Sequence, residues 1–127
     1  MTKSQALYNF WSSFGWPAIN EQSDVDEDTM EILGDGKRRI EYEDSTGDYT
    51  GPVTLTASLF HYSHAWTEVK AKAQQIREYI GNGYLAPIDG GYLWIKARNP
   101  FTMDSAPSDV GWRRIVLNIE ADFLTAI

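Results

Sequence analysis

The sequence predicts one α+β domain spanning residues 1–127, with a mostly antiparallel sheet of four to five strands and two helices packed on one face. Two segments repeat apolar residues at helical spacing, and several shorter segments alternate apolar with polar residues. The links between them are short, as antiparallel pairing allows. A length of 127 residues fits one domain, and a hydrophobic content of 43% is enough for one core.

The first element is predicted to be a helix over about residues 3–14. Thr2 and Gln5 have the spacing of a capping box at its start. The apolar side chains that follow have the spacing of one helical face: Leu7, Phe10, Trp11 and Phe14. Gly15 then suits a left-handed helix end, and Trp16-Pro17 forces an extended exit.

A hairpin is predicted next, after an acidic, turn-rich stretch at 20–36 that reads as a solvated loop. Residues 37–43 form its first strand, with Ile40 and Tyr42 in alternation. Turn residues follow at 44–48, and residues 53–59 alternate again.

The clearest helix of the sequence is predicted to begin at Ser63 as its N-cap and to end at Gly81 or Gly83. Its apolar side chains recur every three or four residues: Trp66, Val69, Ala73, Ile76 and Ile80. Its other face is charged, so the helix packs on a sheet with one side only.

Two further strands are predicted at 92–96 and at 113–123. The residues between them, 97–111, contain two prolines and show little periodicity, so they are predicted to form a long loop.

Composition excludes several classes of function. Eighteen acidic residues against eleven basic ones give a net charge of −7, which disfavours a dedicated nucleic-acid reader. The absence of cysteine excludes disulfides, thiolate metal sites and cysteine nucleophiles. No apolar run approaches the length of a membrane span, so we expect no membrane partner. Phosphate-binding and nucleophile-elbow motifs are also absent, so an enzyme is not expected.

His61 and His64 are the one pair of side chains that suggests metal chemistry. Their spacing allows half of a metal site if a carboxylate joins them, and a small metal-dependent enzyme is the second class of function considered. The favoured interpretation is that these rings satisfy backbone groups at a helix entry or contact a neighbouring subunit. We therefore predict no metal and no cofactor.

Aromatic and charged residues point instead to protein interfaces. Five aromatic residues lie in segments that read as turns: Trp16, Tyr49, Tyr84, Phe101 and Trp112. They either anchor interfaces or pack over the ends of the sheet. Three arginines border the predicted long loop: Arg98, Arg113 and Arg114. Four carboxylates of the acidic stretch are the candidates to pair with them: Glu21, Asp24, Asp26 and Asp28. Opposite charges on one chain can join copies head to tail, with ordinary surface ion pairs as the alternative.

Several short segments resemble small structural proteins of the head–tail modules of long-tailed bacteriophages, and in particular the tail terminator, or tail-completion, family of siphophages. The segments that carry the resemblance are Phe10-Trp11-Ser-Ser-Phe14-Gly15 with Pro17-Ala18, Ile40-Glu-Tyr42, Leu59-Phe60-His-Tyr-Ser63-His-Ala-Trp66, Asn99-Pro100-Phe101 and Arg113-Arg-Ile-Val-Leu-Asn118-Ile-Glu120.

The resemblance implies an α+β subunit of a homo-oligomeric ring, a hexamer in that family. Such a ring caps the last ring of tail-tube protein, ends tube polymerisation and offers its other surface to the head connector or head-closure protein. The chain would then be found in the tail or neck of the virion, and in the host cytoplasm during assembly. By this analogy the docking loops are 20–36, 44–51 and 97–111. A head-closure or minor capsid protein of the neck is the alternative.

Overall fold

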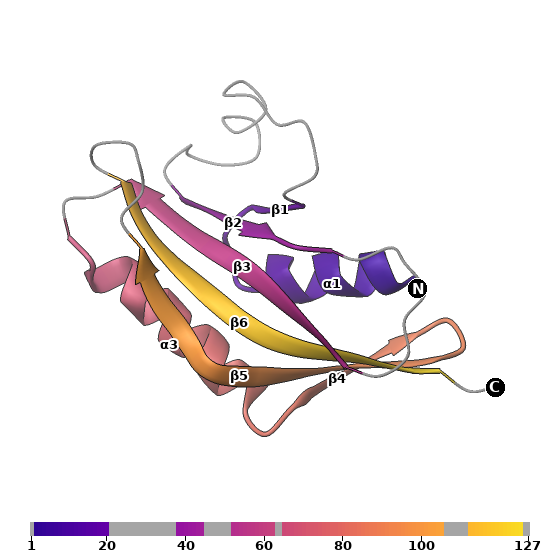
Figure 1. The fold of residues 1–127 in the computed structure, drawn as a ribbon. Helices are drawn as coiled ribbons and strands as arrows, with labels where there is room; N and C mark the ends of the chain where they lie inside the picture. Colours follow the sequence, from indigo (N-terminus) through magenta and orange to yellow (C-terminus); the bar gives the residue numbers. More distant parts are fainter. Residues whose placement is uncertain (1, 21–37, 45–51, 63–64, 106–111, 126–127) are drawn as a thin grey trace.

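The computed structural model describes residues 2–20, 38–44, 52–62, 65–105 and 112–125 (Figure 1). In chain order the elements are α1 (Lys3–Ser12), β1 (Ala18–Asn20), β2 (Arg38–Tyr42), β3 (Val53–Tyr62), α3 (Thr67–Ile80), β4 (Tyr84–Ile88), β5 (Gly91–Ser105) and β6 (Trp112–Thr125). The predicted α+β class is confirmed.

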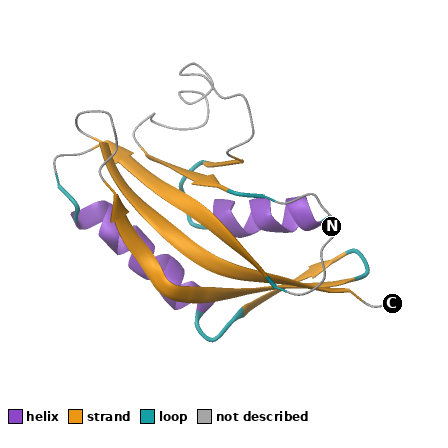
Figure 2. Ribbon diagram, viewed as in Figure 1, coloured by secondary structure: helices purple, strands orange, loops and turns teal. Residues whose placement is uncertain are grey.

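The strands form one curled sheet in the order β1-β2-β3-β6-β5-β4 (Figure 2). Only the β1–β2 pair among these strands is parallel, and the predicted hairpin is present as the antiparallel pair β2–β3. The predicted four to five strands are corrected to six among the described residues. The three residues of β1 are too few to show alternation, and Pro87 makes β4 read as a turn.

The core lies between the helices and one face of the sheet, called here the inner face. Leu59 of β3, Leu117 of β6 and Leu93 of β5 are completely buried on this face. Phe10 of α1 and Ile76 of α3 belong to the same continuous cluster of buried residues. Alternation along the strands places every second side chain on the inner face and makes that face apolar. Both helices cover it, as predicted.

The N-terminus of α1 carries the predicted capping box. Thr2 Oγ1 accepts a hydrogen bond from the Gln5 backbone N–H at 3.1 Å, and Gln5 Oε1 accepts one from the Thr2 backbone N–H at 2.9 Å. The helix ends at Ser12, two residues before the predicted end, and Gly15 follows with a φ of 84°. Trp16 is buried in the core, so the alternative of packing against the sheet holds for this residue.

The second helix begins later than predicted. Trp66 occupies the N-cap of α3 without a side-chain capping bond, so the prediction of Ser63 as N-cap is wrong; Ser63 itself lies outside the described residues. The predicted end is correct, because the Gly81 N–H bonds to the Arg77 carbonyl at the helix terminus. Lys72 Nζ donates to the Phe14 carbonyl at 2.8 Å, which ties α3 to the end of α1.

The predicted loop at 97–111 is corrected, because β5 continues to Ser105 and β6 begins at Trp112. Only 106–111 lie outside the described residues. Ala97 pairs with Ile119 and Thr102 pairs with Leu117, so residues 98–101 of β5 lie opposite Asn118 alone. This bulge hides the alternation of a strand, which explains the wrong prediction.

Candidate functional site

The predicted site residues are divided among different surroundings. The acidic residues and one histidine lie outside the described residues: Glu21, Asp24, Asp26, Asp28 and His64. Most of the predicted docking loops 20–36 and 44–51 lie there too. The remaining predicted residues are strand residues, Arg98 and Phe101 on β5 and Arg113 and Arg114 on β6.

Arg114 lies on the outer face of the sheet, the face opposite the helices. Its Nε and Nη2 donate to Ser58 Oγ at 3.1 and 3.0 Å. The guanidinium lies 5.4 Å from the centroid of the Phe60 ring, and that of Arg39 lies 4.2 Å from the same centroid. Arg39 also donates to Glu41 at 2.9 Å. In this part of the outer face, two guanidinium groups thus lie within about 6 Å of one aromatic ring and also bond polar side chains of the same sheet.

Arg113 lies on the inner face, because neighbouring residues of a strand point to opposite faces. Its guanidinium is 5.6 Å from the Trp66 ring centroid, and Lys70 Nζ is 5.9 Å from that centroid. Arg113 and Arg114 therefore do not form one basic patch.

Arg98 lies near an ion pair on the outer face. Its Nη1 is 3.8 Å from Glu120 Oε1, while Lys96 Nζ is 3.4 Å from Glu120 Oε2. Arg98 is about half exposed, so this contact is an ordinary surface ion pair of small energy.

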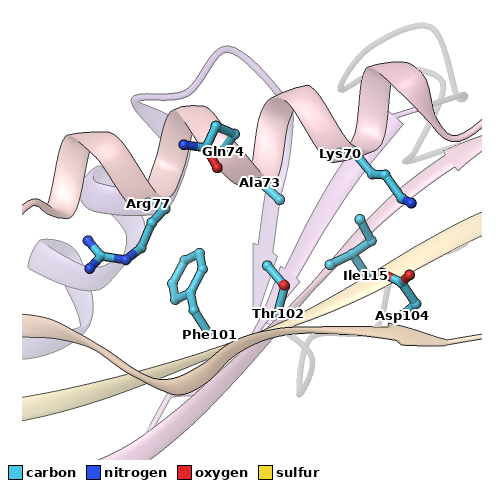
Figure 3. Close-up of a pocket in the computed structure, with 8 residues that line it drawn as sticks. All are labelled: Lys70, Ala73, Gln74, Arg77, Phe101, Thr102, Asp104 and Ile115. Atoms are coloured by element: carbon cyan, nitrogen blue, oxygen red, sulfur yellow. The ribbon is translucent and has the colours of Figure 1, made fainter.

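Phe101, which was predicted as an interface residue, lines a groove between α3 and β5 (Figure 3). The volume of the groove is about 420 Å³, and its lining is Lys70, Ala73, Gln74, Arg77, Phe101, Thr102, Asp104 and Ile115. The bulge of β5 supplies Phe101, which packs against the core. Lys70 and Asp104 stand at one end of the groove, and Arg77 and Phe101 stand toward the other. The site combines apolar surface with two helix cations.

A second pocket lies between α1 and the strands β1 and β2. Its volume is about 580 Å³, and its lining is Ser4, Gln5, Tyr8, Asn9, Asn20, Tyr42 and Asp44. Burial raises the pKa of Tyr42 to about 12, with smaller contributions from the charges of Asp44 and Tyr8. The Tyr42 phenol therefore stays neutral at physiological pH, and this lining offers hydrogen bonds and no activated nucleophile.

His61 lies near one carboxylate. It is 5% exposed on β3, and its Nε2 is 3.2 Å from Glu68 Oε2. Glu68 also bonds Arg38 at 2.5 Å, and the Trp16 ring packs against the imidazole at 5.9 Å between centroids. Within the described parts of the chain, no three His, Asp or Glu residues gather into a metal-binding group.

The sequence did not single out an apolar patch on the outer face, defined by Leu85, Tyr92 and Leu124. These side chains are 54%, 50% and 42% exposed. Tyr92 pairs with Leu124 across β5 and β6, and Leu85 pairs with Trp94 across β4 and β5. The uninterrupted apolar run 92–95 could have indicated this patch. A strand with one buried and one solvated face alternates apolar with polar residues, whereas this run is apolar on both faces.

No helix among the described residues has the length and apolar character needed to cross a membrane. Comparisons of the chain with protein-family models, with curated proteins and with solved structures found no match.

Proposed function

We propose that this protein is a non-catalytic assembly protein of a bacteriophage virion, which forms a ring, caps the tail tube and presents its other surface to the head. The resemblance of its sequence segments to tail terminators supports this proposal. The α+β fold with helices on one face agrees with what that resemblance implies.

The observation that carries the proposal is the apolar patch. Leu85, Tyr92 and Leu124 come from three adjacent strands, and each exposes two fifths or more of its surface. The core of the same domain is already complete, with Leu93 and Ile95 fully buried on the other face of β5. Apolar side chains gathered on an exposed sheet face are typical of a surface that another protein covers.

The nature of the patch also favours protein binding over catalysis. The side chains of Leu85 and Leu124 carry no acid, base or nucleophile, and Tyr92 adds an aromatic ring with a single hydroxyl. A rigid sheet face presents them without the ordering cost that a loop would incur. A flat stacking contact, such as one between a ring and a tube, uses this kind of surface.

The test measures complex formation by size-exclusion chromatography with light scattering. The purified chain is examined across a dilution series, alone and with the tail-tube protein of the same genome. We expect oligomers whose mass rises with concentration, and a stable complex with the tube protein. A chain that stays monomeric even with tube protein contradicts the proposal. Binding to the head connector in place of the tube protein assigns the chain to head closure.

Two variants assign the binding to the patch. The double variant Leu85→Ser with Leu124→Ser should weaken binding to the tail-tube protein at least about tenfold. Each substitution removes apolar area that is buried in the complex. Met103→Ser is the matched control, since Met103 is 46% exposed on the outer face of β5 outside the patch. Equal effects of the control and the patch variant would remove the patch from the binding surface.

A further inference from the structure

We propose that the groove between α3 and β5 receives the acidic segment 24–33 of a second copy of this chain, with Lys70 and Arg77 as its cationic contacts. The inference deepens the proposed function, because it rests on the self-association of the chain and names the two surfaces that meet.

The groove offers cations that the described part of the chain does not neutralise. Lys70 lies 5.9 Å from the Trp66 ring centroid and has no carboxylate within ion-pair distance among the described residues. Arg77 donates to the Gly81 carbonyl at 3.0 Å through Nη1, which leaves other guanidinium donors available. Asp104 also lines the groove, but it forms no ion pair with either cation.

Four other cations of the described residues have a carboxylate partner, whereas Lys72 and Arg114 donate to neutral oxygens. Arg38, Arg39, Lys96 and Arg98 each contact a glutamate of the same chain. In a chain of net charge −7, two cations facing one groove without such a partner are a local excess of positive charge. An acidic ligand is therefore favoured there.

The groove also has an apolar component, which limits the choice of ligand. Ala73 and Ile115 are buried beside it, and Phe101 packs against the core from the bulge of β5. A ligand that satisfies both components carries carboxylates next to aliphatic side chains, and a free inorganic anion does not.

The sequence of this chain contains one segment with that chemistry. Residues 24–33 read Asp-Val-Asp-Glu-Asp-Thr-Met-Glu-Ile-Leu, with aliphatic side chains among the carboxylates and no basic residue. Charge complementarity thus matches this segment to the groove.

The order of the sheet favours a segment from another copy. The segment follows β1 at one edge, whereas β5 is next to the opposite edge, with β2, β3 and β6 between them. A second copy reaches the groove without crossing the sheet. A groove on one copy and a segment on the next also make a heterologous contact, the kind that closes a ring.

Charge reversal in both surfaces tests the proposal. The groove variant carries Lys70→Glu and Arg77→Glu, and the segment variant carries Asp24→Lys, Asp26→Lys and Asp28→Lys, all in the full chain. The three substitutions leave two carboxylates against three lysines in the segment. Each alone should raise the dissociation constant for self-association by about tenfold, because attractive pairs become repulsive. Mixed in equal amounts, they should associate as 1:1 complexes with recovered affinity, since each supplies the surface that complements the other.

A control variant separates this effect from added negative charge on the helix. Ala71→Glu with Gln75→Glu places charges on α3 outside the groove lining, and self-association should stay within twofold of the unmodified chain. Melting curves by circular dichroism identify any variant that does not fold, and recovery in the mixture shows independently that both are folded.

The outcomes separate the two proposals. If the unmodified chain associates and both charge-reversed variants associate equally well, or the mixture does not recover, the groove proposal is wrong and the assembly proposal stands. If the groove variant loses only tube-protein binding, the occupant is the tube and the second-copy assignment is overturned. A chain that stays monomeric both alone and with tube protein overturns both.

Discussion

Gly83 provides the sharpest test of the packing that supports the outer face. It has a φ of 147°, a backbone angle that residues with a Cβ atom rarely adopt. A Cβ built on it would overlap Trp94 Nε1 and would lie 3.1 Å from two other indole atoms. We expect Gly83→Ala to cost about 1–3 kcal/mol in backbone strain. Moving the indole should cost about 1–3 kcal/mol more, because the side chain sits directly on the glycine.

The assay is urea unfolding followed by circular dichroism, which yields the free energy of unfolding of each variant. Gly90→Ala is the matched control, because Gly90 has a φ of 80° with nothing within 4 Å of its built Cβ. It should lose only the backbone part, about 1–2 kcal/mol. In a Trp94→Ala background, the cost of Gly83→Ala should fall to that of the control. Equal losses for Gly83→Ala and Gly90→Ala in the unmodified background would refute the steric argument.

The remaining predictions concern stability. Leu117→Ala should cost about 2–5 kcal/mol in the same unfolding assay, because Leu117 is completely buried at the centre of the sheet; a loss below 1 kcal/mol, on the order of an exposed site, would contradict that. Thr2→Ala should lower the free energy of unfolding by about 0.5–2 kcal/mol, because it removes the acceptor for the Gln5 N–H. Ser4→Ala is the control and should leave that free energy unchanged. The pKa of Tyr42 is about 12 in the folded state and about 10 when unfolded. Its contribution to the free energy of unfolding is therefore complete below pH 10 and disappears as pH rises through 12. Tyr42→Phe should therefore flatten the stability profile over that interval, and an unchanged profile counts against the burial of this phenol.

The sequence allowed prediction of elements whose pattern is local. The capping box at Thr2 and Gln5 defines the start of α1, and the spacing from Val69 to Ile80 defines α3. In both cases the hydrogen bonds or the buried face depend on residues three or four positions apart. Such spacing is visible without knowledge of the fold.

Elements that depend on partners in space were missed. The strand β1 exists because Ala18, Ile19 and Asn20 pair with β2 in parallel, and no local pattern encodes that pairing. The long β5 was missed because its bulge interrupts alternation between Ala97 and Thr102. Phe101 was singled out from composition, but its place in a groove depends on this bulge.

The candidate charges show the same limit. Arg113 and Arg114 are adjacent in sequence and were grouped with Arg98 as charges that border one loop, yet they point to opposite faces of β6. Lys70 and Arg77 read as part of a solvated helix face, and only the position of β5 places them beside a groove. Which charges act together is decided by the sheet and not by their separation along the chain.

The two proposed contact surfaces share one strand and face opposite ways. The regular first part of β5 presents Tyr92 outward beside Leu124, whereas the bulge brings Phe101 to the inner groove under α3. A ring subunit that also stacks on a tube needs two such independent surfaces, because neighbours within the ring and the tube must bind at the same time. Effects of patch and groove substitutions on their own complexes should accordingly be separable, since the two sets of side chains do not touch.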